Sequence, residues 1–303
     1  MIQNSSFVGI WIMIAGGIIL PLAVCIWWLR TKKERLTTVL VGAAIWFIFA
    51  MVLETVPKYF LFNPETSLGK TVLGSVVLYT LFGALLAGVF EETGRYIAFK
   101  TILRKRKNKE TGISYGIGHG GFEAMFLLLY SGIQYVVFAS MINSGSFQDM
   151  LNQIAGGGVD ISTMEALPEQ IMAITPLFGL VAVVERVSAM LLHVALSIMV
   201  FYSVRESKPW MYVMAVLLHA LFDVPAALYQ TGVIGMYVTE LMLAIYAIVF
   251  FVIIYRKLYL KDTKILRAEG DAALVDTNTA ALVESSIGDS EDEVQSDVIF
   301  EKL

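Results

Sequence analysis

Ionisable side chains recur inside the long apolar stretches of this 303-residue chain. Charged groups at membrane depth are costly and default to a functional role. They are Glu91, Glu92, Arg95, His119, Glu123, Glu185, Arg186, His193, His219 and Asp223, and they include the only three histidines of the chain. Imidazoles with nearby carboxylates are the ligands that zinc prefers, and a catalytic zinc keeps one position for a water whose proton a glutamate takes. The sequence therefore predicts a zinc site inside a membrane.

Four of these residues are expected at one depth, because each lies 10 to 12 positions from a basic residue at a span end. The pairs are Glu92 with Arg104, His119 with Lys109, His193 with Arg205, and His219 with Lys208. At 1.5 Å of rise per residue, the four side chains lie about 15–18 Å from the basic ends. Four helices of alternating direction would thus bring one glutamate and three histidines into one layer.

The spacing within each helix predicts which side chains share a face. His119 and Glu123 are four residues apart, as are His219 and Asp223, so each pair lies on one helix face. Glu123 is therefore expected to support the metal ligands from outside. Glycines beside His119 predict close helix packing there.

The E-E-T-G-R stretch places Glu91 four residues and Glu92 three residues before Arg95, so the arginine can pair with one glutamate. A structural ion pair between Glu91 and Arg95 is the favoured interpretation. Glu185 and Arg186 are expected near the opposite membrane interface, about two turns from His193. Glu185 is a further candidate for a supporting role.

The elements that must position these residues are membrane-spanning helices. The chain is 57% hydrophobic and 16% charged, with a mean hydropathy of +0.71, which excludes an ordinary soluble domain. The predicted fold is an all-α polytopic bundle of about seven spans, with a four-helix core at 71–228 carrying the polar site. The expected spans are 7–29, 36–56, 71–99, 112–141, 172–203, 209–228 and 233–255.

Basic residues predict the orientation in a cell membrane. Lysine and arginine concentrate in the 30–35 and 100–110 connections, whereas the 143–170 loop has none. The positive-inside rule then puts the N-terminus outside and the C-terminus in the cytoplasm. Two regions are expected, a membrane domain at 1–260 and an acidic, disordered tail at 261–303. The basic residues are explained by orientation, so the sequence gives no sign of nucleic-acid binding.

Three motifs resemble those of the YhfC family of intramembrane metalloproteases, within the CAAX-protease and bacteriocin-processing (CPBP) superfamily. They are the paired glutamates Glu91 and Glu92, the Y-G-I-G-H motif ending at His119, and the H-A-L-F-D motif from His219 to Asp223. The resemblance covers about residues 70–230. The sequence differs from the prenyl-protein proteases in one spacing, because Arg95 follows Glu91 by four residues rather than five.

The resemblance implies that Glu92 activates water, that His119 and His219 complete the site, and that Asp223 assists or stabilises the oxyanion. Glu91 and Arg95 belong to the same catalytic motif, and His193 matches a further histidine of the subgroup. The implied activity is hydrolysis of a membrane-embedded or membrane-proximal protein or peptide by a glutamate-activated, metal-bound water.

Other functions remain open from the sequence. A metal-free glutamate mechanism is one alternative to zinc. A non-catalytic scaffold or chaperone, and a proton- or metal-coupled transporter, are alternatives to an enzyme. Because the site lies toward the basic side of the membrane, the substrate is expected to be a transmembrane helix or a segment entering from the cytoplasm.

Overall fold

The computed structural model of the chain describes residues 1–157 and 161–262. The chain divides into two compact units, Met1–Tyr255 and Arg256–Leu303. The predicted acidic tail lies, from residue 263 onward, outside the described residues. The functional residues named above all belong to the first unit.

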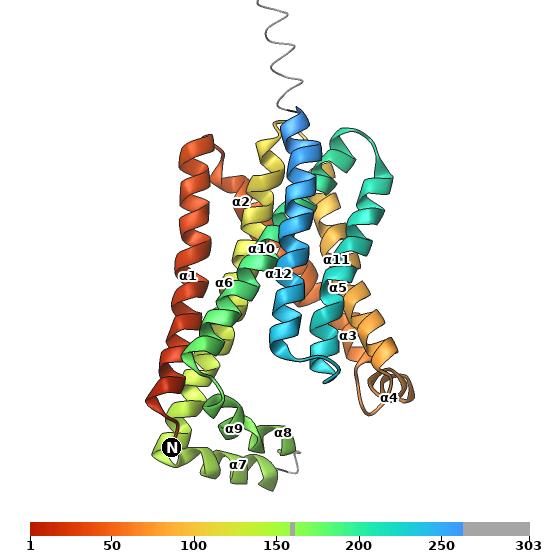
Figure 1. Cartoon of the computed structure of the whole chain (residues 1–303). Coiled ribbons are helices and arrows are strands. Elements are labelled where there is room, and N and C mark those ends of the chain that lie inside the picture. Colours follow the sequence, from red (N-terminus) through yellow and green to blue (C-terminus); the bar gives the residue numbers. More distant parts are fainter. Residues whose placement is uncertain (158–160, 263–303) are drawn as a thin grey trace, which may run out of the picture. The chain divides into compact units, whose positions relative to one another are not determined.

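The described residues form helices and contain no strand. Seven helical stretches among them are long and apolar enough to cross a membrane, which confirms the all-α polytopic fold (Figure 1). The helices that form or begin these stretches are α1 (Asn4–Lys32), α2 (Leu36–Trp46), α5 (Val76–Lys100), α6 (Glu110–Ser144), α10 (Pro176–Arg205), α11 (Pro209–Gln230) and α12 (Met236–Ile254). The remaining α-helices are α3 (Thr55–Leu61), α4 (Ser67–Leu73), α7 (Ser146–Gly156), α8 (Ser162–Glu165) and α9 (Leu167–Met172).

Local sequence sets where two core helices begin. The Ser75 side chain accepts a hydrogen bond from the Leu78 amide at 3.3 Å, and the Thr175 side chain accepts one from the Phe178 amide at 3.2 Å. Both are N-caps that satisfy an otherwise free donor of the first turn. The third predicted span therefore begins at Val76 rather than at residue 71, because residues 71–73 belong to the separate helix α4.

The second predicted span is longer than expected and is not a uniform α-helix. After α2 the chain continues through a π-helical segment, η1 (Phe47–Leu53), into α3. The Glu54 amide donates to the Phe49 carbonyl at 2.9 Å, a five-residue separation. Such π-helical insertions are rare and occur frequently at functional sites.

Helix α10 is the centre of the bundle. It packs against α1, α5, α6, α11 and α12, and 83% of its most apolar stretch is buried, against 17–39% for the other six. The other long helices bury one face and leave apolar side chains on the other, as expected where lipid replaces water. Figure 1 shows α10 (green) running between its neighbours.

Glycines bring α6 very close to α10. A Cβ atom at Gly116 would lie 2.6 Å from the Cα of Val194, and one at Gly120 would lie 2.9 Å from the Cβ of His193. Real Cβ atoms do not approach so closely, so these positions require glycine. The close approach places His119 on α6 beside His193 on α10.

Candidate metal centre and catalytic site

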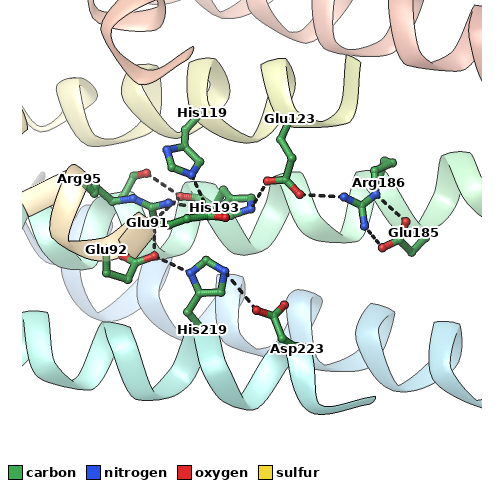
Figure 2. A network of polar contacts seen from close by, with 11 residues as sticks. Glu91, Glu92, Arg95, His119, Glu123, Glu185, Arg186, His193, His219 and Asp223 are labelled. Carbon is green, nitrogen blue, oxygen red and sulfur yellow. Dashed lines mark hydrogen bonds and ion pairs between the residues drawn. The ribbon is translucent and has the colours of Figure 1, made fainter. Parts of the chain in front are cut away.

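Four helices contribute the predicted polar residues to one cluster. Helix α5 supplies Glu91, Glu92 and Arg95; α6 supplies His119 and Glu123; α10 supplies Glu185, Arg186 and His193; and α11 supplies His219 and Asp223 (Figure 2). The three histidines are at most 3% exposed, so none faces lipid. The imidazole centroids of His119 and His193 are 4.7 Å apart, and those of His193 and His219 are 5.3 Å apart. The three histidines, which the sequence predicts in one layer of the membrane, therefore also lie in one cluster.

Glu91 contacts two of the histidines. Its Oε2 lies 2.9 Å from His119 Nε2 and 3.9 Å from His193 Nδ1. The Glu91 side chain is 9% exposed and that of His119 is fully buried. A buried carboxylate is tolerated only where such partners surround it.

Glu123 contacts the other side of His193. Its Oε2 lies 2.6 Å from His193 Nε2, and its Oε1 accepts a hydrogen bond from Arg186 at 2.8 Å. Arg186 also pairs with the neighbouring Glu185. Glu185 thus acts on the cluster only through Arg186, whereas Glu123, predicted as an outer residue, touches an imidazole directly.

Arg95 pairs with Glu92 and not, as predicted, with Glu91. Its Nη1 lies 3.3 Å from Glu92 Oε1, and both side chains are fully buried. It also donates to the His193 carbonyl at 3.3 Å and lies 3.1 Å from His193 Nδ1. Consecutive residues of a helix point about 100° apart, so Glu91 faces His119 while Glu92 faces Arg95.

His193 has a polar partner at each ring nitrogen. The guanidinium of Arg95, which can only donate, lies 3.1 Å from Nδ1. Glu123 Oε2 lies 2.6 Å from Nε2. The structure thus orients this imidazole from both sides.

His219 connects Glu92 to Asp223. Its Nδ1 lies 2.8 Å from Glu92 Oε1, and its Nε2 lies 3.6 Å from Asp223 Oδ2. Asp223 is 28% exposed and lines a cavity of about 130 Å³ together with residues from α5, α6, α10, α11 and α12. The ionisable residues in that wall are Glu91, Glu123, Glu185, Arg186, His193, His219 and Asp223.

Among the described residues, one group has the composition and spacing of a metal site. Donor atoms of Glu91, His119, Glu123 and His193 all lie within 4.8 Å of one another. His219 is not in this group, so the group holds two of the three predicted histidine ligands. It adds Glu91, predicted as catalytic, and Glu123, predicted as an outer residue.

Sequence reasoning missed one buried acid near the cluster. Glu54, which follows the π-helical segment, is 2% exposed and lies 2.7 Å from the half-exposed Lys58. The four-residue spacing of Glu54 and Lys58 at the end of a span was the signal available. Arg186, which was identified as intramembrane but not as a site residue, also joins the cluster through Glu123.

The fold and the cluster together define a polytopic helical membrane protein with a buried histidine–carboxylate centre. The family model of YhfC intramembrane metalloproteases matches residues 16–246. The chain is 33% identical, over 235 residues, to the "Uncharacterized membrane protein YhfC" of Bacillus subtilis (strain 168), covering 77% of this chain and 89% of that protein. The chain belongs to the YhfC family. No solved structure matches it.

Proposed function

We propose that this protein is an intramembrane metalloprotease that hydrolyses a peptide bond of a membrane-embedded or membrane-proximal substrate. The observation that carries the proposal is the buried group of Glu91, His119, Glu123 and His193, with Glu92 next to it on α5. The family's name supports the same activity. Buried, clustered ionisable groups beside a cavity are the usual signature of a functional site.

The donor set fits a divalent metal, and zinc in particular. Imidazole nitrogens and carboxylate oxygens are standard zinc ligands, and Glu91, His119, Glu123 and His193 offer two of each within 4.8 Å. We assign these four as the residues that would hold the ion. When bound, zinc supplies Lewis acidity that polarises a carbonyl and activates water. Ligation by all three histidines stays a prediction, since His219 engages Glu92.

Glu92 is the best candidate for the general base. Its Oε1 is held by Arg95 and His219, while its buried Oε2 makes no hydrogen bond within the described part of the chain. A fixed carboxylate with one free oxygen can accept a proton from water at Oε2. It keeps its position because Arg95 and His219 hold the other oxygen.

His219 and Asp223 are placed to act on the carbonyl oxygen or the leaving amine of the cleaved peptide bond. His219 is held at Nδ1 by Glu92, so its Nε2 is available toward the cavity that Asp223 lines. An imidazole N–H there can stabilise negative charge on the carbonyl oxygen or protonate the leaving amine. Asp223 would orient this ring.

The test is Glu92→Gln, which removes the base but keeps the shape. Loss of a general base lowers the rate by about 10²–10⁴-fold, so new peptide termini in membranes expressing the wild type should disappear in the variant. Mass-spectrometric mapping of termini measures this. Zinc content of the purified variant should remain near that of the wild type.

A metal assay tests the ligand assignment separately. His119→Ala and His193→Ala should lose zinc on elemental analysis of purified protein. Glu185→Gln, which changes a residue contacting Arg186 rather than an imidazole, should retain it. Equal zinc in all four proteins would remove the assignment, and absence of zinc from the wild type as well would favour a metal-free glutamate mechanism.

One observation favours a second function, a non-catalytic scaffold. The carboxylates, imidazoles and arginines pair with one another, so the cluster can lock the helices together without a metal. In that case Glu92→Gln leaves every new peptide terminus in place, and the cellular role survives metal removal.

A further inference from the structure

A hollow lies beside the cluster, at the ends of α5 and α11 that are far from Lys100 and Pro209. It has a volume of about 460 Å³. Its walls come from α3, α5, α6 and α11. Polar residues in them are Lys58, Tyr79, Asp223 and Gln230, and the small ones are Gly83, Ala84, Ala226 and Ala227. We refer to it as the α5–α11 pocket.

The α5–α11 pocket shares a wall with the cavity of the cluster. Asp223 and Ala226 line both. The Asp223 side chain is 28% exposed, whereas the side chains of Glu91 and Glu92 are 9% and 0% exposed. Asp223 is therefore the point at which the buried cluster meets this pocket.

Open space beside α5 makes room for the pocket. At Gly88 α5 touches α11, since a Cβ atom there would lie 2.6 Å from the Val216 carbonyl oxygen. At Gly83, which lines the pocket more than one turn nearer the start of α5, a Cβ atom would meet nothing within 4 Å.

The size of the pocket limits what can occupy it. A helix about 10 Å wide fills about 420 Å³ per 5.4 Å turn, so 460 Å³ admits roughly the equivalent of one turn and not a whole spanning helix. An occupant must therefore present only a short segment of chain. Backbone N–H and C=O groups of that segment that are not paired within it need partners from the pocket.

The rim of the pocket offers such partners. The Tyr79 hydroxyl donates to Gln230 Oε1 at 2.8 Å across α5 and α11, and Lys58 is 45% exposed beside them. Below the rim, Gly83 and Ala226 add little side-chain bulk, which leaves space for side chains of the occupant. Polar groups above and open space below suit a polypeptide segment.

We propose that the α5–α11 pocket is the binding site and access route for the scissile segment of the substrate, a short polypeptide stretch whose side chains occupy the open space at Gly83 and Ala226. The proposal rests on the protease function proposed above. With the orientation predicted from the basic residues, the pocket lies toward the outside. The substrate would then enter from the outer side of the membrane, whereas the sequence suggested entry from the cytoplasm.

Thiol labelling tests the access route without any catalysis. Cys25 is the only cysteine of the chain, so Ala226→Cys in a Cys25→Ala background gives one reporter thiol. A charged, membrane-impermeant thiosulfonate is added to intact cells or to inverted membrane vesicles. We expect labelling from the face that carries α3 and α4. Labelling only from the face of the basic loops, or from neither face, overturns the proposal.

A plug at Gly83 sharpens this test. Gly83→Trp adds a large side chain where the backbone leaves open space, and it should slow labelling of the reporter by an order of magnitude. Leu81→Trp, at a position that is 48% exposed on the same helix, is the matched control and should leave the rate unchanged. Gly83→Leu replaces Gly83→Trp if the tryptophan variant is not monodisperse on gel filtration. Equal labelling rates in the plugged and control proteins would contradict the assignment of the pocket as the access route.

Mapping of cleavage termini then separates this proposal from the function on which it rests. If termini depend on Glu92 but persist at the wild-type level with Gly83→Trp, the pocket is not the route. If they disappear with Gly83→Trp and remain with Leu81→Trp, the pocket carries the substrate. If Glu92→Gln changes no terminus while labelling behaves as expected, the protease function fails, and with it the assignment of a scissile segment to the pocket.

Discussion

The two halves of the bundle, on either side of the histidine–carboxylate cluster, are packed in opposite ways. Toward the basic loops, glycines on α6 contact the backbone of α10 at Gly112 and Gly116, and every residue from Leu192 to Ser203 is buried. Away from them, Gly83 on α5 faces open space, and hollows of about 460 Å³ and 130 Å³ both border Asp223. The cluster is thus closely packed on one side and bordered by hollows on the other.

The largest expected effect comes from Arg95→Met on the closed side. Arg95 is fully buried and pairs with fully buried Glu92. Removing one partner of a buried pair leaves an uncompensated charge and costs about 3–5 kcal/mol. Denaturant titration of the purified protein measures the loss in free energy of unfolding. Adding Glu92→Gln should recover part of it, and a double variant as unstable as the single one contradicts the pairing.

Arg186→Met makes the matched change on the open side and should have a smaller effect. Arg186 is 18% exposed and borders the 130 Å³ cavity, so water can solvate the partners it leaves. A loss of about 1.5–3 kcal/mol, the range for a hydrogen bond to a charged group, is expected. The same titration measures this loss in free energy of unfolding. A loss equal to that of Arg95→Met would contradict the difference in packing between the two sides of the cluster.

Gly116→Ala tests the close contact between α6 and α10. The added Cβ would lie 2.6 Å from the Val194 Cα, and backbone cannot yield as a flexible side chain can. Overpacking of this kind costs about 1–3 kcal/mol. Thermal unfolding in detergent should show a lower midpoint. An unchanged midpoint would mean that the two helices are not so close.

Gly83→Ala should have the smallest effect and the opposite sign. Its Cβ meets nothing within 4 Å, and replacing glycine by alanine inside a helix stabilises by about 0.5–1 kcal/mol. A slightly raised unfolding midpoint is the expected result. A lowered midpoint would show that α5 and α11 are in contact there after all.

The sequence predicted the fold well because lipid leaves little choice. Backbone groups without water must bond within a helix, so each apolar stretch of sufficient length becomes a span. The details that it missed are local. Residues 71–73 form part of α4 rather than α5, because the chain turns at Gly74 and restarts at the Ser75 cap. The π-helical turn before Glu54 had no signal in the apolar pattern.

The depth of the candidate site was also available from the sequence. Rise along a helix is fixed at 1.5 Å per residue, so distance from the basic ends placed Glu92, His119, His193 and His219 in one layer. The structure brings those four residues into one cluster. Metal ligation by them remains a prediction.

Only the tertiary structure decided how each helix is rotated about its axis. Adjacent residues point about 100° apart, and spacing alone allowed Arg95 to reach either glutamate. The packing of α5 against α10 and α11 turns Glu91 toward His119 and Glu92 toward His219. It also leaves open space at Gly83. Depth follows from covalent geometry along one helix, whereas rotation and the space between helices depend on side chains that meet from different helices.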